Sequence, residues 1–234
     1  MAITKEIKYK IQRLGGCQEV SVQVPYVLCA GWSGRSQDKV KEHIDELVKL
    51  GVPAPTEIPI LFSITNDMIT TTRHVDVQGK ETSGEVEFVL INIGGEWFVT
   101  VGSDQTDREA EQFNIEKSKQ LCQKITGQVL WPLDEVKDHW DALRLAAWVT
   151  KGGKRVPYQD EDLSALITYQ MLLDLVQRKL PCVLPEVPIF SGTIPTKTGL
   201  VFADLFEMEF KDPVLGRSIY HRYSVRSLNE TLGL

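Results

Sequence analysis

Glu85 and Glu87 are two acidic residues in a stretch whose other members are mostly apolar. In a β-strand, residues two apart project from the same face, so both carboxylates would share one side while Val86 and Phe88 share the other. Neighbouring like charges on one face repel each other unless a cation lies between them. The pattern therefore has two interpretations: the solvated face of an ordinary strand, or part of a cation site.

A third carboxylate favours the cation site. Gly94-Gly95 separates the two glutamates from a second β-prone stretch that ends at Asp104. If the two glycines form a two-residue turn, counting outward from them places Asp104 opposite Glu85. Three converging carboxylates form the all-oxygen site that Mg²⁺ or Mn²⁺ prefers, with water completing the coordination. We therefore predict that Glu85, Glu87 and Asp104 bind a divalent metal ion.

A second Glu-x-Glu pattern provides an internal control. Glu207 and Glu209 alternate with the apolar residues Phe206, Met208 and Phe210. They are not followed by a strand end that runs into a helix and carries a third carboxylate. We expect these two glutamates to lie on the solvated face of a strand.

The elements around the predicted hairpin are mostly strands. Apolar and β-branched residues predict strands at 3–12 and 19–29 on either side of Gly15-Gly16, and a β-rich region from 60 to about 103. Apolar residues at helical spacing predict a helix within 36–51. Further helices are predicted at 106–124 and 163–180, and further strands at 142–150, 187–191 and 200–211. The order indicates an α+β, β-rich fold and not a doubly wound parallel sheet.

The composition excludes several classes of protein. Among 234 residues, 32 acidic and 26 basic side chains give a formal net charge of −6, which argues against a protein built to bind nucleic acid. No apolar run reaches the ~20 residues that span a bilayer, and the first residues lack the apolar stretch of a secretion signal. We therefore expect a cytoplasmic protein without a membrane partner. Four cysteines without CxxC spacing indicate reduced thiols and no zinc site.

The ordered set of motifs resembles the fumarylacetoacetate hydrolase superfamily. Members carry a Glu-x-Glu strand, an Asp at the end of a nearby strand and an Arg four residues later, and this chain has Glu85, Glu87, Asp104 and Arg108 in those places. Two later segments are also similar to the family. Residues 118–135, which include Lys119, resemble its lysine segment and the proline-containing stretch beyond it. Residues 189–195, which include Gly192 and Thr193, resemble its Thr-Gly-Thr-Pro turn.

The resemblance covers about residues 26–227 and implies a mixed β-roll or barrel with a few peripheral helices. It implies one domain over residues 1–234, in which 1–30 form N-terminal strands and 36–51 form a lid helix. Glu111 stands where many members have glutamine, and the segment after Gly31 is longer than usual. These departures concern the substrate pocket and not the metal ligands, and they indicate an outlying, bacterial branch.

The resemblance also implies roles for four residues beyond the metal ligands. Arg108 would bind a substrate carboxylate or orient Asp104. Lys119 would stabilise an enolate oxygen or a leaving carbanion. Gly192, through its amide, and Thr193 would hold a substrate carboxylate or carbonyl.

His43 and Glu46 lie three residues apart within the predicted helix at 36–51, so they share a helical face. A carboxylate beside an imidazole fixes its tautomer and raises its basicity, which gives a base suited to neutral pH. The resembling family uses such a His-x-x-Glu pair to activate water. The alternative interpretation is a surface helix with incidental charges.

These inferences predict a Mg²⁺- or Mn²⁺-dependent hydrolase that cleaves a carbon–carbon bond in a small 2-oxo or 1,3-dicarbonyl acid. The same metal site without water attack gives a decarboxylase or a keto–enol isomerase, and a hydratase using the same site is a further alternative. A catalytically idle binding domain on the same fold is the third alternative. The resemblance also implies that the protein is a homodimer. Apart from the second copy of the chain, the expected partner of the protein is a small-molecule substrate.

Overall fold

The computed structural model describes residues 3–49, 54–55, 57–182 and 185–233. Within the first helix, the side chains at 39, 43, 46, 47 and 49 lie outside this description. The N-terminal hairpin forms as predicted around Gly15-Gly16, but the strand expected at 19–29 is divided at Pro25, which has no N–H to donate to a neighbouring strand.

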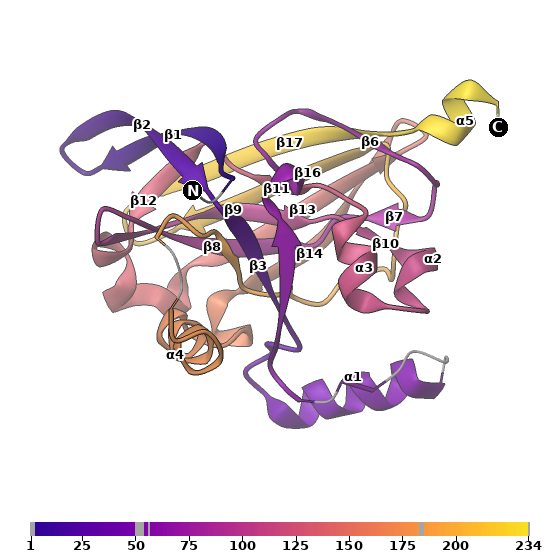
Figure 1. Ribbon diagram of the computed structural model, residues 1–234, viewed down its shortest axis with the longest axis horizontal. Coiled ribbons are helices and arrows are strands. Elements are labelled where there is room, and N and C mark those ends of the chain that lie inside the picture. The colour runs from indigo at the N-terminus through magenta and orange to yellow at the C-terminus, as the bar shows by residue number, and fades with distance from the viewer. Residues whose placement is uncertain (1–2, 50–53, 56, 183–184, 234) are drawn as a thin grey trace.

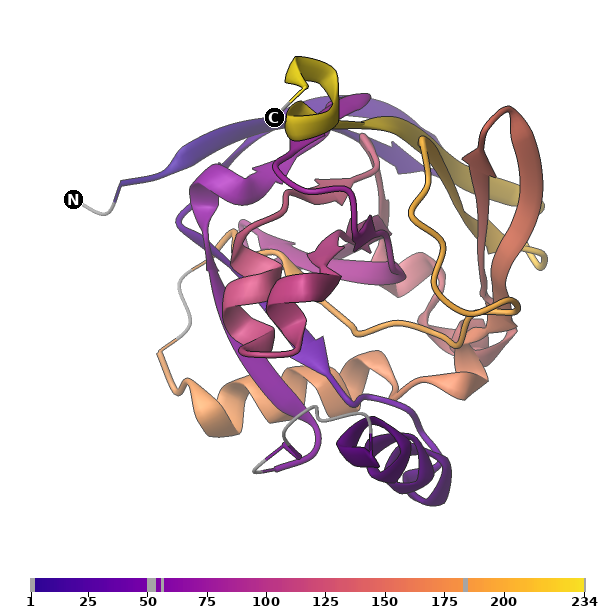
Figure 2. The ribbon, with the colours of Figure 1, turned by 90° about the vertical axis from the view of Figure 1, so that its right-hand side faces the viewer.

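A curled, mixed sheet of ten strands forms the larger layer (Figures 1 and 2). Its strands follow the order β2-β1-β12-β9-β8-β15-β3-β4, with β11 beside β9 and β5 beside β11. Most neighbours are antiparallel, but β1–β12, β15–β3 and β11–β5 pair in parallel. The bounds are β1 (Lys5–Arg13), β2 (Gly16–Val24), β3 (Tyr26–Gly31), β4 (Ile60–Thr65), β5 (Ile69–Thr70), β8 (Val86–Ile93), β9 (Glu96–Asp104), β11 (Lys124–Thr126), β12 (Val129–Pro132) and β15 (Ile189–Phe190).

A second sheet of five strands packs against one face of the first, in the order β14-β13-β16-β17-β6. A two-stranded pair, β7 with β10, lies where β9 leads into the short helices. The sequence prediction omitted β14, which pairs with β13 across the turn at Gly152-Gly153. The bounds are β6 (His74–Val77), β7 (Thr82–Ser83), β10 (Thr106–Asp107), β13 (Arg144–Lys151), β14 (Lys154–Asp162), β16 (Leu205–Asp212) and β17 (Arg217–Ser227).

The helices are short and peripheral: α1 (Gln37–Lys49), α2 (Arg108–Glu111), α3 (Ile115–Gln120), α4 (Tyr169–Lys179) and α5 (Leu228–Leu232). The single helix predicted at 106–124 is wrong. The side chains of Asp107 and Asn114 each accept a backbone N–H three residues on and start separate helices. The helix predicted at 163–180 begins only after Thr168, whose hydroxyl caps α4. No helix in the described part of the chain is long and apolar enough to span a bilayer.

Strand β8 is buried on both faces and so joins two apolar clusters. Val86, Phe88 and Leu90 face the five-stranded sheet. Val89 and Ile91 face the other way, toward residues of β1 to β4. The second cluster lies inside the curl of the large sheet, and Glu87 projects from this same inner face because it is two residues before Val89.

The control glutamates depart from expectation in one respect. Glu207 is only 7% exposed, so the prediction of a solvated position is wrong for this residue. Arg155 stacks on the Trp148 ring at 4.7 Å and binds the Glu207 carboxylate, and the Tyr220 hydroxyl donates to it as well. These side chains cover Glu207 and satisfy its charge, whereas Glu209 is half-buried.

Candidate metal centre

The hairpin of β8 and β9 has the register that the two glycines predict. Ile93 pairs with Glu96 across Gly94-Gly95, and Glu87 pairs with Gly102. Both turn glycines have positive φ, 61° and 90°, which glycine adopts without steric cost. One step beyond the last paired residues, the Asp104 N–H donates to the carbonyl oxygen of Glu85 at 3.0 Å. The predicted opposition of these residues is confirmed.

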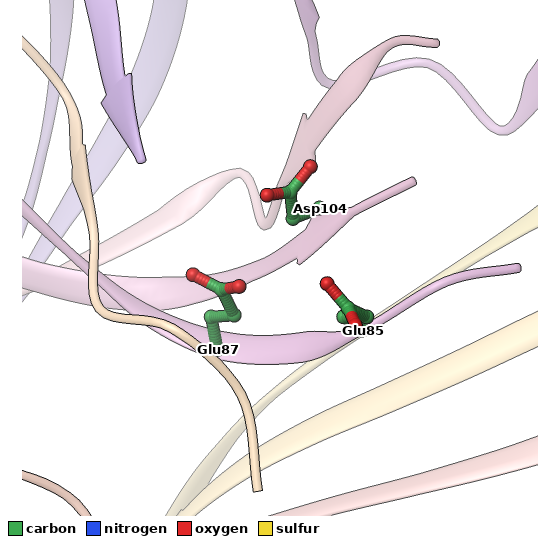
Figure 3. A group of neighbouring side chains, drawn as sticks. All are labelled: Glu85, Glu87 and Asp104. Carbon is green, nitrogen blue, oxygen red and sulfur yellow. The ribbon is translucent and has the colours of Figure 1, made fainter. Parts of the chain in front are cut away.

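The three predicted metal ligands converge at the end of this hairpin. One carboxylate oxygen from each of Glu85, Glu87 and Asp104 lies within 4.8 Å of the others (Figure 3). Asp104 and Glu87 are buried, with 0% and 1% exposure, and the Glu85 side chain is 19% exposed. The cluster therefore opens toward solvent beside Glu85.

Two lysine ammonium groups bind Asp104. Lys119 Nζ lies 2.6 Å from Oδ2, and Lys124 Nζ lies 2.9 Å from Oδ1. Burial alone would raise the pKa of Asp104, but the two ammonium groups outweigh it and lower the pKa to about 2. The Asp104 carboxyl is therefore ionised throughout the physiological pH range.

Arg108 fixes the orientation of Glu85. Its Nη2 lies 2.9 Å from Glu85 Oε1, its Nη1 donates to both oxygens of Glu111 at 3.0 and 2.8 Å, and its Nε donates to Ser83 Oγ at 2.7 Å. Of the two roles expected for Arg108, the structure shows an orienting one, directed at Glu85 and not at Asp104. Burial would raise the pKa of Glu85, but Arg108 and then Lys119 lower it below its usual value.

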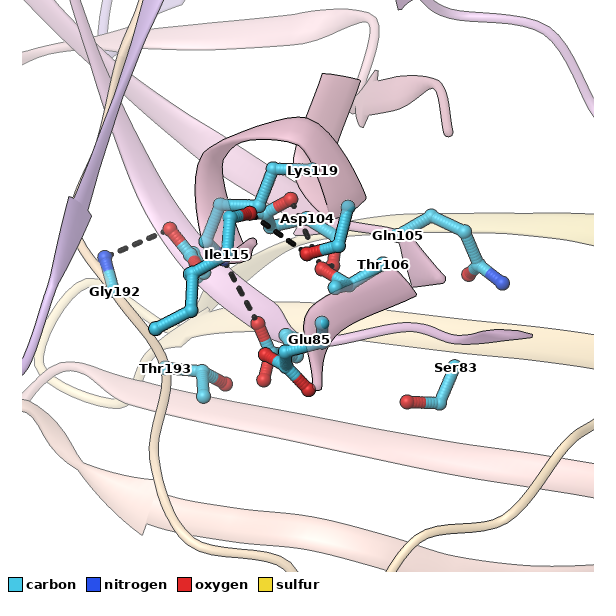
Figure 4. A network of polar contacts seen from close by, with 12 residues as sticks. Ser83, Glu85, Asp104, Gln105, Thr106, Ile115, Lys119, Gly192 and Thr193 are labelled. Atoms are coloured by element: carbon cyan, nitrogen blue, oxygen red, sulfur yellow. Dashed lines mark hydrogen bonds and ion pairs between the residues drawn. The ribbon is translucent and has the colours of Figure 1, made fainter. Parts of the chain in front are cut away.

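Glu87 is the least compensated of the three carboxylates. Its Oε2 accepts the backbone N–H of Gly192 at 2.8 Å (Figure 4). Burial, and next the negative charge of Asp104, raise the pKa of Glu87 well above its usual value. A bound cation would offset the buried negative charge of Glu87, for which the described residues provide no ion pair. The donor set of three hard carboxylates therefore fits a Mg²⁺ or Mn²⁺ ion.

The turn at Gly192 and Thr193 holds the strand that carries Glu87. Gly192 has a φ of +81°, and a Cβ there would come within 2.1 Å of Ser33 Oγ, so this position needs glycine. The Thr193 hydroxyl donates to the Val86 carbonyl at 2.9 Å and accepts from Gln159 Nε2 at 2.7 Å. Both residues lie beside the triad, as expected, and here they position β8.

A buried hydrogen-bond network supports the hairpin from the side of the five-stranded sheet. The Glu85 N–H donates to Ser103 Oγ at 3.2 Å, and that oxygen lies 2.8 Å from the hydroxyl of Tyr223. Tyr223 donates to Gln105 Oε1, whose amide nitrogen donates to Thr82 Oγ1, both at 2.8 Å. The backbone on both sides of the triad is thus fixed by residues from β7, β9 and β17.

His43 and Glu46 lie on α1, which runs along the edge of the molecule in both views (Figures 1 and 2). Their side chains lie outside the described part of the chain. Their pairing and their role in water activation therefore stay predictions.

Two surface hollows lie away from the triad. One, of about 200 Å³, is lined among others by Phe62, Ser63 and Glu116, and the other, of about 310 Å³, lies around His74 and Arg226. Neither is lined by a triad residue. Phe62 connects the first hollow with the site, because its ring centre lies 5.9 Å from Lys119 Nζ.

Lys124 is the site residue that sequence reasoning missed. It is fully buried, and its ammonium group donates to the carbonyl oxygens of Gln105, Lys119 and Cys122 in addition to binding Asp104. In the sequence it begins a short β-prone stretch and resembles a surface lysine. Only the pairing of β11 with β9, in which Lys124 faces Asp104, places it in the site.

Residues 30–223 match the family described as "Protein of unknown function (DUF2848)". No curated protein sequence matches the chain significantly.

Solved structures resemble the fold over most of the chain. Cg1458 has a TM-score of 0.63 at 13% identity, with 95% of this chain and 100% of that chain covered. The yeast protein ynq8, described as a fumarylacetoacetate hydrolase family protein, has a TM-score of 0.60 at 15% identity, with 87% and 94% covered. A 2-keto-3-deoxy-D-arabinonate dehydratase complexed with magnesium and 2,5-dioxopentanoate has a TM-score of 0.59 at 18% identity, with 89% and 76% covered. These likenesses confirm the expected fumarylacetoacetate hydrolase-like fold.

Proposed function

Because the chain belongs to the DUF2848 family and has the fumarylacetoacetate hydrolase fold, we propose that it is a divalent-metal-dependent hydrolase that cleaves a carbon–carbon bond in a small 2-oxo or 1,3-dicarbonyl acid. One observation carries the proposal: Glu85, Glu87 and Asp104 bring three carboxylates within 4.8 Å at a largely buried position. Burying like charges together is costly unless a cation neutralises them.

The metal and the substrate class have separate support. The donor set favours a hard cation, Mg²⁺ or Mn²⁺. The similar dehydratase structure is described with magnesium and 2,5-dioxopentanoate, a small oxo acid. At 18% identity this likeness supports the choice of substrate class to test and not a particular substrate.

A metal bound by Glu85, Glu87 and Asp104 would act as a Lewis acid toward the 2-oxo acid. The chain's own residues would supply the rest. Arg108 keeps Glu85 in place, and the Gly192 amide keeps Glu87 in place. With both carboxylates fixed before substrate binds, little reorganisation remains for the reaction itself.

Hydrolysis also needs a base that activates water and a group that stabilises the enolate formed when the carbon–carbon bond breaks. His43, oriented by Glu46, would take a proton from water, and the resulting hydroxide would add to the distal carbonyl carbon. As the carbon–carbon bond breaks, its electron pair becomes that of an enolate, whose oxygen the Lys119 ammonium would hold by a hydrogen bond. Thr193 and the Gly192 amide would contact the substrate's carboxylate or carbonyl only by exchanging their present acceptors, the Val86 carbonyl and Glu87 Oε2, for a substrate oxygen.

A second candidate uses the same centre without carbon–carbon hydrolysis: a decarboxylase, a keto–enol isomerase or a hydratase acting on a 2-oxo acid. One observation favours it: among the described side chains, the groups that contact the triad carboxylates are the ammonium and guanidinium groups of Lys119, Lys124 and Arg108 and the Thr106 hydroxyl, none of which accepts a proton at neutral pH. His43→Ala separates the two candidates. A hydrolase loses turnover, whereas a decarboxylase or isomerase keeps it.

The metal centre itself is tested by thermal unfolding with and without Mg²⁺ or Mn²⁺, followed by titration with oxalate as a mimic of the 2-oxo acid head. We expect the metal to raise Tm in the native protein and not in Glu85→Ala, because ligands that bind only the folded state stabilise it. Glu209→Gln is the matched control from the other Glu-x-Glu strand and should keep the shift. An equal shift in Glu85→Ala, or none in the native protein, would favour the idle binding domain.

A further inference from the structure

The Lys119 ammonium group lies against two of the three candidate metal ligands. Its Nζ is 2.6 Å from Asp104 Oδ2 and 3.5 Å from Glu85 Oε2 (Figure 4). The residue is only 6% exposed. A divalent cation that bound the same two carboxylates would meet this positive charge within a few ångströms, in surroundings that screen it poorly.

The two lysines of the site differ in how firmly they are held. Lys124 donates to three backbone carbonyl oxygens as well as to Asp104 and has no exposed surface. The contacts described for the Lys119 ammonium are the two carboxylates and the ring face of Phe62. Lys124 is therefore part of the scaffold, while Lys119 can leave the carboxylates without breaking any described hydrogen bond to the backbone.

We propose that Lys119 is an exchangeable internal cation: its ammonium group neutralises Asp104 and Glu85 until a divalent metal ion displaces it from them. This inference rests on the metal centre proposed above. The exchange keeps the buried carboxylates compensated at every stage, because the lysine charge leaves as the metal charge arrives. It also places the freed ammonium beside the metal, where it is available to a substrate oxygen only after the metal has bound.

The exchange predicts opposite effects of removing the Lys119 charge. Lys119→Met keeps the length of the side chain, so the metal no longer competes with an ammonium group. We expect Mn²⁺ to bind this variant at least about tenfold more tightly than the native protein, because a unit positive charge near the site is gone. The EDTA-treated variant should have a lower Tm than the native protein, since Asp104 and Glu85 have lost a counter-charge.

Isothermal titration with Mn²⁺ measures the affinity, with Lys117→Met as the matched control. Lys117 lies two residues away on the same helix and is exposed, so its loss should change the affinity by no more than about twofold. Equal or weaker Mn²⁺ binding by Lys119→Met would overturn the exchange while leaving the metal centre intact. No Mn²⁺ binding by either protein would overturn the metal centre and the exchange together.

A second measurement detects displacement of the Lys119 ammonium group in the native protein. It tests the exchange by itself if Lys119→Met does not fold. Reductive methylation is performed with and without Mn²⁺, and each lysine is quantified by peptide mass spectrometry. We expect Mn²⁺ to increase methylation of Lys119 and to leave Lys124 protected. Unchanged protection of Lys119 on Mn²⁺ binding would show that the ammonium stays in place, which contradicts the exchange even if the charge affects the affinity.

Discussion

Two strands of this protein carry a Glu-x-Glu pattern between apolar residues, and their surroundings differ. In β16, Glu207 has its own guanidinium partner, Arg155, at 2.7 Å, and a hydrogen bond from the Tyr220 hydroxyl. Where β8 begins, Glu85 and Glu87 meet a third carboxylate, Asp104, from the neighbouring strand. The first strand thus pairs its buried charge with an opposite charge, while the second gathers like charges.

The pKa shifts of the buried glutamates record this difference. Burial would raise the pKa of Glu207, but Arg155 and Tyr220 lower it below its usual value. Burial raises the pKa of Glu87 well above its usual value, and the nearby Asp104 raises it further. The sequence pattern determines which side chains share a strand face. The neighbouring strands determine whether the glutamates on that face meet an arginine and form an ion pair, or meet another carboxylate and form a candidate cation site.

Asp104→Asn should give the largest effect on stability. It leaves the buried ammonium groups of Lys119 and Lys124 without the carboxylate that both contact. Removing one partner of a buried ion pair costs about 3–5 kcal/mol. In Glu207→Gln, the Arg155 side chain left behind is half-exposed, so we expect a loss of only about 0.5–1 kcal/mol. Urea unfolding of EDTA-treated protein measures both, and equal losses would contradict the distinction between the two strands.

Glu87→Gln should abolish stabilisation by the metal. With one site and Mn²⁺ at about 100 times its Kd, binding adds about 2.7 kcal/mol to the native protein. The amide introduced by this substitution is a weaker ligand without charge, so the gain should disappear, whereas Glu207→Gln should keep it. Urea unfolding with and without Mn²⁺ measures the gain. A full gain in Glu87→Gln would show that the metal binds elsewhere.

The two glutamates should affect stability with opposite dependence on pH in EDTA-treated protein. The pKa of Glu87 is raised in the folded state, so its contribution is fully present below the ordinary value of 4.5 and is lost as pH rises through the folded-state pKa. Glu87→Gln cannot ionise and should therefore gain stability relative to the native protein as pH rises.

The pKa of Glu207 is lowered, so its contribution is present above the ordinary value of 4.5 and is lost as pH falls through the folded-state pKa. Glu207→Gln should be less stable than the native protein at neutral pH, and the difference should shrink in acid. Unfolding free energies from about pH 2 to about pH 8 cover both sides of that value and test both slopes. Slopes of the same sign would contradict the comparison.

Tyr220→Phe should give the smallest effect. It removes one donor to Glu207 and leaves Arg155 in place. Because Tyr220 is 49% exposed, we expect a loss near the lower end of the usual range for a hydrogen bond, about 0.5 kcal/mol. Stabilisation by Mn²⁺ should be unchanged, and a change would link β16 to the metal centre.

The parts of the site that depend on local sequence could be predicted. Gly94-Gly95 sets the hairpin register, and the alternation along β8 sets the shared face of Glu85 and Glu87. Lys124 could not be predicted, because it enters the site through the pairing of β11 with β9. The target of Arg108 was missed for a similar reason: a short helix starting at Arg108 directs its guanidinium to Glu85 and Glu111.

Helix bounds were predicted less well than strands because caps decide them. The charged stretch at 106–124 has helical composition throughout, yet Asp107 and Asn114 bind backbone N–H groups and start two helices in place of one. Thr168 delays α4 in the same way. Apolar periodicity does not report such local competition between side chain and backbone.

The hairpin has a consequence for how this protein can evolve. All three proposed metal ligands are inherited within one contiguous stretch, residues 85–104, closed by its own turn. Helix α1 (Gln37–Lys49), which we propose as a lid, and the turn at 189–195, which we propose to contact the substrate, are encoded far away on either side. Mutations in those distant segments that spare Gly192 and Thr193 can therefore change which acid is accepted while a single short piece of the gene preserves all three proposed metal ligands.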